Sequence, residues 1–127
     1  MMACTMEGPP LLSIIAGTTY GFDVSWTTGD DSNPYVKLFG CTAVFVVRSI
    51  EGEVLVRGTT ESGHITIIEH QQQSDALDIK VTHDQTQGHQ PTAWENASYE
   101  VRVTFPSGDP YSILRGPAVL IKGAVDD

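Results

Sequence analysis

The chain has 127 residues, of which 40% are hydrophobic and 18% are charged, and 16 acidic residues outweigh 7 basic ones to give a formal net charge of −9. This length and composition predict one globular domain with a single core, and they exclude both a disordered chain and two ordinary domains. The negative charge repels nucleic acid at long range, and the lysines and arginines are scattered singly along the predicted strands. We therefore expect no local basic patch and no nucleic acid partner.

The N-terminal segment 1–15 is rich in Met and Pro and lies outside the strand rhythm that follows. Its apolar run 11–16 is far too short to cross a bilayer, and no basic region of a secretory signal precedes it. We expect synthesis in the cytosol and no membrane partner. Segment 1–15 is interpreted as an extended arm or an added edge strand. The candidate partner-binding residues of this arm are its large aliphatic side chains, Leu11, Leu12, Ile14 and Ile15.

Strand patterns begin directly after this arm. In residues 20–26 apolar and polar side chains alternate, which predicts a strand with one buried face. Residues 41–49 are apolar at both alternating positions, which predicts a central strand covered on both faces. The glycine of "IEG", Gly52, can take a left-handed conformation, so we expect a hairpin with a bulge there.

The second half of the chain contains one departure from the strand pattern. Residues 77–81 alternate again, but "THDQTQGHQPTAWENAS" does not. Thr82 and Gln85 have the spacing of a capping box, which predicts a single helical turn that Gly88 and Pro91 end.

The last strands form the clearest pattern. Residues 99–105 alternate, "PSGD" supplies a turn, and residues 111–121 return, which predicts a long antiparallel hairpin. In total, seven or eight short strands recur at intervals of about ten residues. The predicted fold is all-β: an antiparallel β-sandwich, Ig-like or jelly-roll-like, with residues 16–127 as a single domain and an extended N-terminal arm.

No motif points to catalysis, a metal or a cofactor. The four histidines lie at no ligand spacing, and Cys4 and Cys41 alone make neither a zinc site nor a disulfide framework, although a single bridge between them stays open. The turn "GDDSN" offers oxygen donors but lacks the pattern of a helical calcium loop. We therefore expect a protein that is not an enzyme and needs no cofactor. The histidines considered are His64, His70, His83 and His89.

Two aromatic residues remain candidates for contact with a sugar. Trp26 and Tyr20 share the predicted buried face of one strand, whereas Tyr35 and Trp94 lie in or beside predicted loops. Aromatic rings on a surface offer flat apolar area for sugar stacking. Tyr35 and Trp94 thus keep a carbohydrate-binding module open as an alternative function.

Several segments, in order, resemble a family of β-sandwich modules of tailed bacteriophages. They are "AGTTYGFDVSW", "LFGCTAVFVVRS", "GTTESGHITI", "LDIKVTHDQT" and "ASYEVRVTFPSGDPYSILRGPAVLIKG", which together span residues 16–123. Within them the matching pattern comprises Leu38, Gly40, Ala43, Arg48, residues 99–103, Leu114, Gly116 and Val119. In this respect the chain is similar to the N-terminal domain of phage baseplate upper proteins.

This resemblance implies a non-enzymatic structural protein of the virion, assembled in the host cytoplasm, that docks onto a symmetric assembly at the baseplate, the tail or a fibre attachment. The partners it implies are other virion proteins, and we expect a homo-oligomer. A capsid decoration protein of the same phage is an alternative. The family offers no catalytic residues to transfer.

Overall fold

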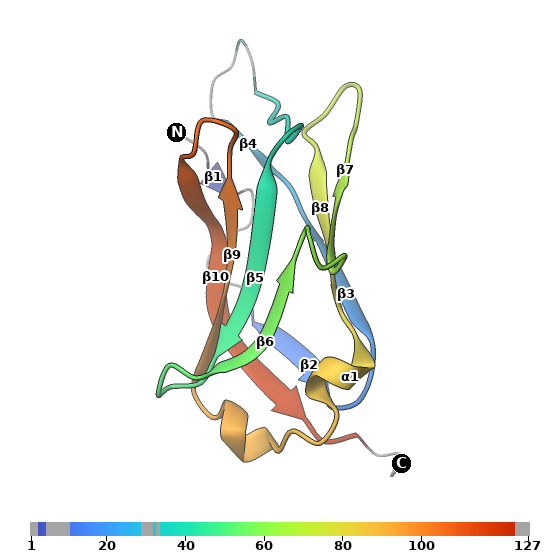
Figure 1. Ribbon diagram of the computed structural model, residues 1–127, viewed down its shortest axis with the longest axis vertical. Coiled ribbons are helices and arrows are strands. Elements are labelled where there is room, and N and C mark those ends of the chain that lie inside the picture. Colours follow the sequence, from blue (N-terminus) through green and yellow to red (C-terminus); the bar gives the residue numbers. More distant parts are fainter. Residues whose placement is uncertain (1–2, 5–10, 29–31, 33, 124–127) are drawn as a thin grey trace.

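The structure is a computed structural model that describes residues 3–4, 11–28, 32 and 34–123 (Figure 1). Among these residues eight strands have four or more residues, which confirms the predicted all-β sandwich. They are β2 (Leu12–Ile15), β3 (Tyr20–Val24), β5 (Thr42–Arg48), β6 (Val54–Thr59), β7 (Ile65–Ile68), β8 (Ala76–Val81), β9 (Ala97–Thr104) and β10 (Pro110–Ile121). The shorter elements are β1 (Ala3–Cys4), β4 (Trp26–Thr27), the helical turn α1 (His83–Thr86) and the 3-10 turn η1 (Pro91–Trp94).

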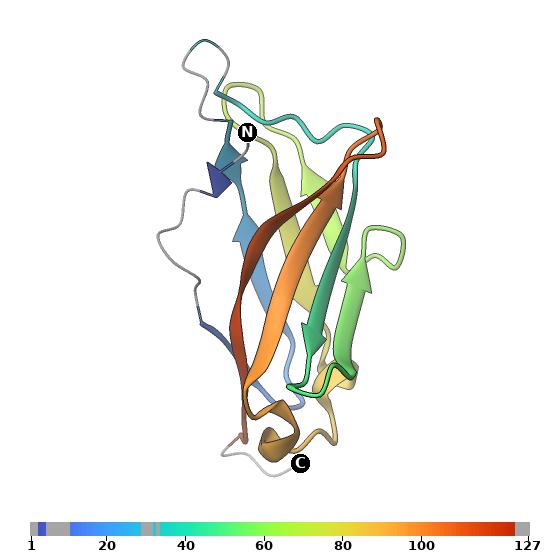
Figure 2. The same cartoon turned by 90° about the vertical axis from the view of Figure 1, so that its left-hand side faces the viewer.

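Two sheets form the layers of the sandwich, as the side view shows (Figure 2). The five-stranded sheet has the order β2-β10-β9-β5-β6, and the three-stranded sheet has the order β3-β8-β7. The short strand β1 pairs with β4. The buried side chains of both sheets meet in one core that includes Trp26, Phe45 and Val101.

Strand pairing is antiparallel with one exception. Both predicted hairpins are confirmed: β5 pairs β6 across a turn in which Gly52 has φ +93°, and β9 pairs β10 across a turn in which Gly108 has φ +93°. The bulge expected at Gly52 is wrong in position, because the register of β5 and β6 shifts between Val47 and Arg48. Strand β2, however, pairs parallel with the end of β10, with Leu12 opposite Ala118 and Ile15 opposite Ile121. A purely antiparallel sandwich is thus wrong at this pair, where nearly the whole chain serves as the long crossover that parallel strands need.

Residues 12–15 belong to the sandwich. Within β2, Leu12 and Ile14 are buried in the core, while Ile15 is exposed on the opposite side of the strand. Leu12 and Ile14 were expected to grip a partner, and this expectation is wrong because their side chains already fill the space between the sheets. Residues 1–2 and 5–10 of the expected arm lie outside the described residues.

Strand β5 is central in its sheet, between β6 and β9, as predicted. Its inward residues Ala43, Phe45 and Val47 are buried, but the alternate residues Val44 and Val46 are only partly buried. The expectation that both faces are covered is wrong, because no described element lies over the outer face of this sheet. The apolar character of that face therefore needs another explanation.

The predicted capping box is present at the start of α1. The Thr82 backbone N–H donates to Oε1 of Gln85 at 3.0 Å, and Gly88, with φ +82°, follows the turn. The Gln85 side chain also donates to the Arg57 carbonyl at 2.8 Å, which ties α1 to β6. In the described part of the chain, the helical segments are too short and too polar for any to span a membrane.

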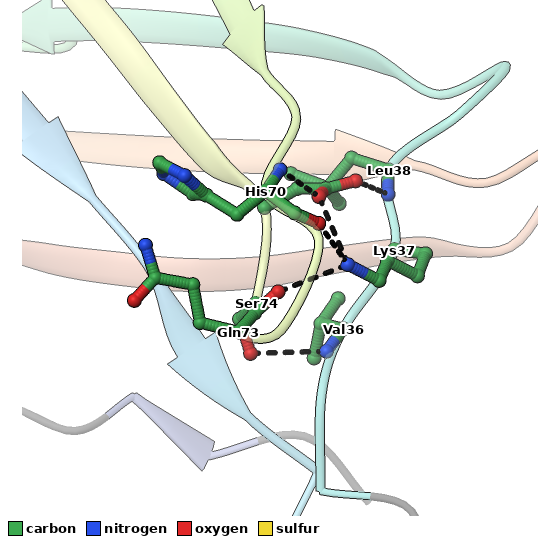
Figure 3. A network of polar contacts seen from close by, with 7 residues as sticks. Val36, Lys37, Leu38, His70, Gln73 and Ser74 are labelled. Atoms are coloured by element: carbon green, nitrogen blue, oxygen red, sulfur yellow. Dashed lines mark hydrogen bonds and ion pairs between the residues drawn. The ribbon is translucent and has the colours of Figure 1, made fainter.

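A network of polar contacts joins the loop before β5 to the loop between β7 and β8, with Lys37, Leu38 and His70 among its members (Figure 3). The buried carboxylate of Asp75 lies at its centre. The carboxylate of Asp75 accepts hydrogen bonds from the backbone N–H groups of Leu38 at 2.9 Å and His70 at 3.0 Å, and it lies 3.4 Å from the Lys37 ammonium. Burial raises the pKa of Asp75, but these hydrogen bonds and the Lys37 charge outweigh burial and leave the pKa below its ordinary value. Asp75 is a structural charge.

Candidate functional site

The register of four strands brings distant residues together on the outer face of the five-stranded sheet. On β5, Val46 lies opposite Arg57 of β6 on one side and opposite Glu100 of β9 on the other. Glu100 in turn lies opposite Arg115 of β10. Because directly opposite residues point to the same side of a sheet, Arg57, Glu100 and Arg115 share this face.

The other two arginines join the same face. Arg102 lies two residues beyond Glu100 and opposite Val44, and Arg48 lies two residues beyond Val46 and opposite Ser98. All four arginines of the chain are therefore exposed on one sheet face, which we call the arginine face. The three lysines lie elsewhere: in the loop before β5, on β8 and after the end of β10.

A β-bulge in β10 turns the side chain of Arg115 to the outer face of the sheet. Ser112 lies opposite Arg102, and the register then shifts so that Leu114 lies opposite Val101 and Arg115 opposite Glu100. Without the bulge, regular alternation over the three residues that follow Ser112 would turn Arg115 toward the core. The bulge instead buries both Ile113 and Leu114 and leaves Arg115 in solvent.

Only part of the positive charge on this face is neutralised. Arg102 donates to the Glu100 carboxylate from Nε at 3.2 Å and from Nη2 at 2.9 Å. Partial burial raises the pKa of Glu100, but the hydrogen bonds from Ser112 and Arg102 and the nearby arginine charges outweigh it and lower the pKa. The side chains of Arg57 and Arg115 make no hydrogen bond or salt bridge to the described residues.

Two depressions mark the arginine face. The larger, of about 410 Å³, has Val46 and Pro117 in its lining together with Arg48, Glu100 and Arg115. The smaller, of about 200 Å³, is lined by Arg57 and Arg102 among others. Partly buried aliphatic side chains beside guanidinium groups suit a surface that another molecule covers, since arginine pairs with carboxylates and also packs through its stem.

A cluster of exposed aliphatic residues lies at the β2 edge of the same sheet. Ile15 is directly opposite Ile121, and Val119 lies two residues before Ile121 on the same side of β10. Leu11, immediately before β2, is 60% exposed. We call Leu11, Ile15, Val119 and Ile121 the apolar corner. Two of the four residues expected to bind a partner, Leu11 and Ile15, therefore lie on the solvent side.

The expectation that the chain has no local basic patch is wrong. Along the sequence the arginines stand alone, and only the strand order and the bulge bring them together. One signal was visible beforehand: Arg48, Arg57 and Arg102 each take an outward position of an alternating strand, while no lysine does so on these strands. Sequence order alone does not reveal that these strands are neighbours.

The two predicted sugar-contact aromatics do not lie together. Trp94 is 1% exposed, and its indole N–H donates to Nδ1 of His89 at 3.2 Å, so its assignment as a surface residue is wrong. The η1 turn folds the ring into the core. Tyr35 is exposed and lines a depression of about 220 Å³ with His70 and Gln73.

The described side chains include neither a candidate metal centre nor an exposed free cysteine. In the part of the chain that is described, no three His, Cys, Asp or Glu side chains lie close enough to hold a metal ion. The acidic turn 29–33 lies largely outside the described residues. Cys41 is a free, buried thiol whose pKa is raised by burial and by the charge of Asp75, so little of it is the reactive thiolate at neutral pH.

Comparison with known proteins gives no family. No protein-family model matches the chain, and no curated protein matches it. Among solved structures, one similar chain is described as "Crystal structure of Dpr1 IG1 bound to DIP-eta IG1". It shares 13% sequence identity, covers 96% of this chain and 98% of that chain, and has a TM-score of 0.43. A likeness at this level supports no conclusion about function or partner.

Proposed function

We propose that the protein is a non-catalytic docking module of a multiprotein assembly, and that its arginine face and apolar corner form the docking surface. The observation that carries the proposal is the placement of all four arginines, and no lysine, on one sheet face beside exposed aliphatic residues. The resemblance of the sequence to phage baseplate modules supports a tailed-phage virion as this assembly, with docking at the baseplate, the tail or a fibre attachment.

The chemistry of the face favours a protein partner. Protein interfaces are enriched in arginine and depleted in lysine, because a guanidinium is weakly hydrated and binds carboxylates with two parallel hydrogen bonds. A nucleic acid site would gain from every cation, yet Glu100 sits among the arginines and the chain as a whole carries a net charge of −9. The apolar corner adds surface that phosphates do not use.

The experiment measures how much of the parent protein and of each variant is found in phage particles purified from a host that produces it. Replacement of Arg57 and Arg115 by Gln should reduce the amount bound per particle by about tenfold while leaving the melting temperature unchanged. Lys80→Gln on the opposite sheet is the matched control and should be incorporated like the parent. Immunogold labelling of the particles then separates a baseplate or tail location from capsid decoration.

Three outcomes would overturn the proposal. The first is that purified particles lack the protein. The second is that the Arg57 and Arg115 variant is incorporated like the parent, and the third is that the arginine face binds duplex DNA and no protein.

Carbohydrate binding is the second candidate function. It now rests on Tyr35 alone, which lines a polar depression with His70 and Gln73. A glycan array compared between the parent and Tyr35→Ala tests it. Binding that the substitution abolishes would support this candidate, whereas no binding by the parent would remove it.

A further inference from the structure

A second surface has the chemistry opposite to that of the arginine face. A depression of about 330 Å³ lies between the β5–β6 hairpin and η1, and three glutamates line it: Glu51, Glu53 and Glu95. No basic residue is among those that line it, and Ile50 at its rim is 70% exposed. We call this surface the glutamate pocket.

The charges of the glutamate pocket are not neutralised by the part of the chain that the structure describes. None of the three carboxylates forms a salt bridge with a described residue, and the nearby Arg48 donates from Nη1 to the Gly52 carbonyl at 2.9 Å. Glu51, Glu53 and Glu95 are all exposed. Three carboxylates in a depression that Ile50 and Leu55 also line suit the guanidinium group and alkyl stem of an arginine from another molecule.

We propose that the glutamate pocket of one copy binds the arginine face of a second copy, with Arg57 and Arg115 as the cations that pair with its carboxylates. This inference rests on the proposed docking role of the arginine face and names its partner. The charges match, because Arg57 and Arg115 on one surface and the three glutamates on the other form no salt bridge with the described residues of their own chain. The exposed Ile50 would add an apolar contact with Val46 and Pro117, which line the larger depression of the arginine face.

The positions of the two surfaces determine the kind of assembly. The β5–β6 hairpin and η1, which line the glutamate pocket, lie at one end of the sandwich, whereas the strands that carry the arginine face run along its length (Figure 1). The contact therefore joins two different surfaces, which is a heterologous arrangement. Such contacts build a ring where the rotation closes and a filament where it does not.

The net charge of −9 makes two copies repel each other at long range. At physiological salt concentration this repulsion does not decide whether the copies associate. At about 0.15 M ionic strength the Debye length is about 8 Å, so only charges close to the contact interact strongly. At the contact, arginines of one copy lie near glutamates of the other. Association should therefore be measured at this ionic strength, where distant repulsion is screened.

The experiment is sedimentation velocity and light scattering at increasing protein concentration. The face variant carries Arg57→Gln and Arg115→Gln, the pocket variant carries Glu51→Gln, Glu53→Gln and Glu95→Gln, and the control carries Asp23→Asn and Lys80→Gln on the other sheet. All the replaced side chains of the face and pocket variants are exposed, so matching melting temperatures verify that folding is unchanged.

The parent and the control should form dimers and larger species, and each of the two variants alone should associate about tenfold more weakly. An equimolar mixture of the two variants should give a 1:1 complex and nothing larger, because only one intact contact remains. The inference is overturned when the parent stays monomeric, when the mixture stays monomeric, or when the control loses association equally. A monomeric parent whose face variant is still lost from particles would reject this inference and leave the docking function standing.

Discussion

On the outer face of the three-stranded sheet, Asp23 lies directly opposite Asp78, with Lys80 two residues along the same strand. The outer face of the five-stranded sheet carries four arginines around Glu100 and continues into the apolar corner. Both faces belong to alternating strands, and the fold requires only that their outer residues tolerate water. One face shows the mixed signs of an ordinary solvated surface. The other concentrates one type of cation next to aliphatic residues, which the fold does not require and for which the proposed docking role accounts.

The largest expected effect on stability comes from a comparison of substitutions on the inner and outer faces of β9. Val101 is fully buried between the outward residues Glu100 and Arg102, so Val101→Asp places an unpaired charge in the core. We expect a loss of roughly 4 kcal/mol or more in the free energy of unfolding. The Ser98→Asp variant, changed on the exposed side of the same strand, should have the same denaturant midpoint of unfolding as the parent. Equal midpoints for the two variants would contradict the assignment of the faces.

The two sides of β2 provide the next test. Ile14 is fully buried and Ile15 is 46% exposed, although both are isoleucines on the same short strand. Ile14→Ala should lower the free energy of unfolding by about 2 to 5 kcal/mol, because it leaves a cavity in the core. Ile15→Ala should change it by less than about 0.5 kcal/mol while weakening incorporation into particles. Equal destabilisation by the two variants in a urea titration would mean that the apolar corner serves the fold and not a partner.

A third test compares a charge that the fold uses with charges that it does not use. Asp75→Asn removes a buried carboxylate that accepts two backbone hydrogen bonds and should cost about 2 to 3 kcal/mol at neutral pH. The Arg57 and Arg115 replacements, by contrast, should leave the free energy of unfolding nearly unchanged.

The pH dependence of unfolding gives the Asp75 prediction a second readout. The pKa of Asp75 is lowered in the folded state, so the unfolded state binds its proton first as the pH falls. Its stabilisation is therefore present above the unfolded pKa and is lost as the pH drops through the folded pKa. Urea titrations from pH 7 down to acid should show a shallower loss of stability for Asp75→Asn than for the parent. A parallel decline in both proteins would contradict this role.

Local sequence patterns predicted the strands and turns. Features that depend on contacts between distant segments could not be predicted in this way. The alternation in residues 20–26, the Thr82 capping box and the turn at Gly108 each act over a few residues, so the sequence displays them directly. The burial of Trp94 depends on how η1 packs against the rest of the domain, and the residues next to Trp94 in the sequence do not predict that packing.

The arginine face was still harder to predict from the sequence, because its formation depends on strand order and on a bulge. Two strands far apart in sequence, β5 and β9, must be neighbours before Arg48 and Arg102 share a surface. The bulge at Ile113 then changes the side on which Arg115 emerges. A one-residue change in register reverses every side chain that follows, so single arginines in a sequence say little about a patch.

The smallest expected effect lies at the centre of the arginine face. Glu100 and Arg102 are both substantially exposed, so Glu100→Gln should lower the free energy of unfolding by less than about 1 kcal/mol at neutral pH. The pKa of Glu100 is lowered in the folded state, so this small contribution is present near neutral pH and is lost as the pH falls through the folded pKa. The same substitution frees the Arg102 guanidinium and adds one net positive charge to the face. Association with an acidic partner should therefore strengthen while stability slightly declines, and weaker association by sedimentation would show that Glu100 itself contacts the partner.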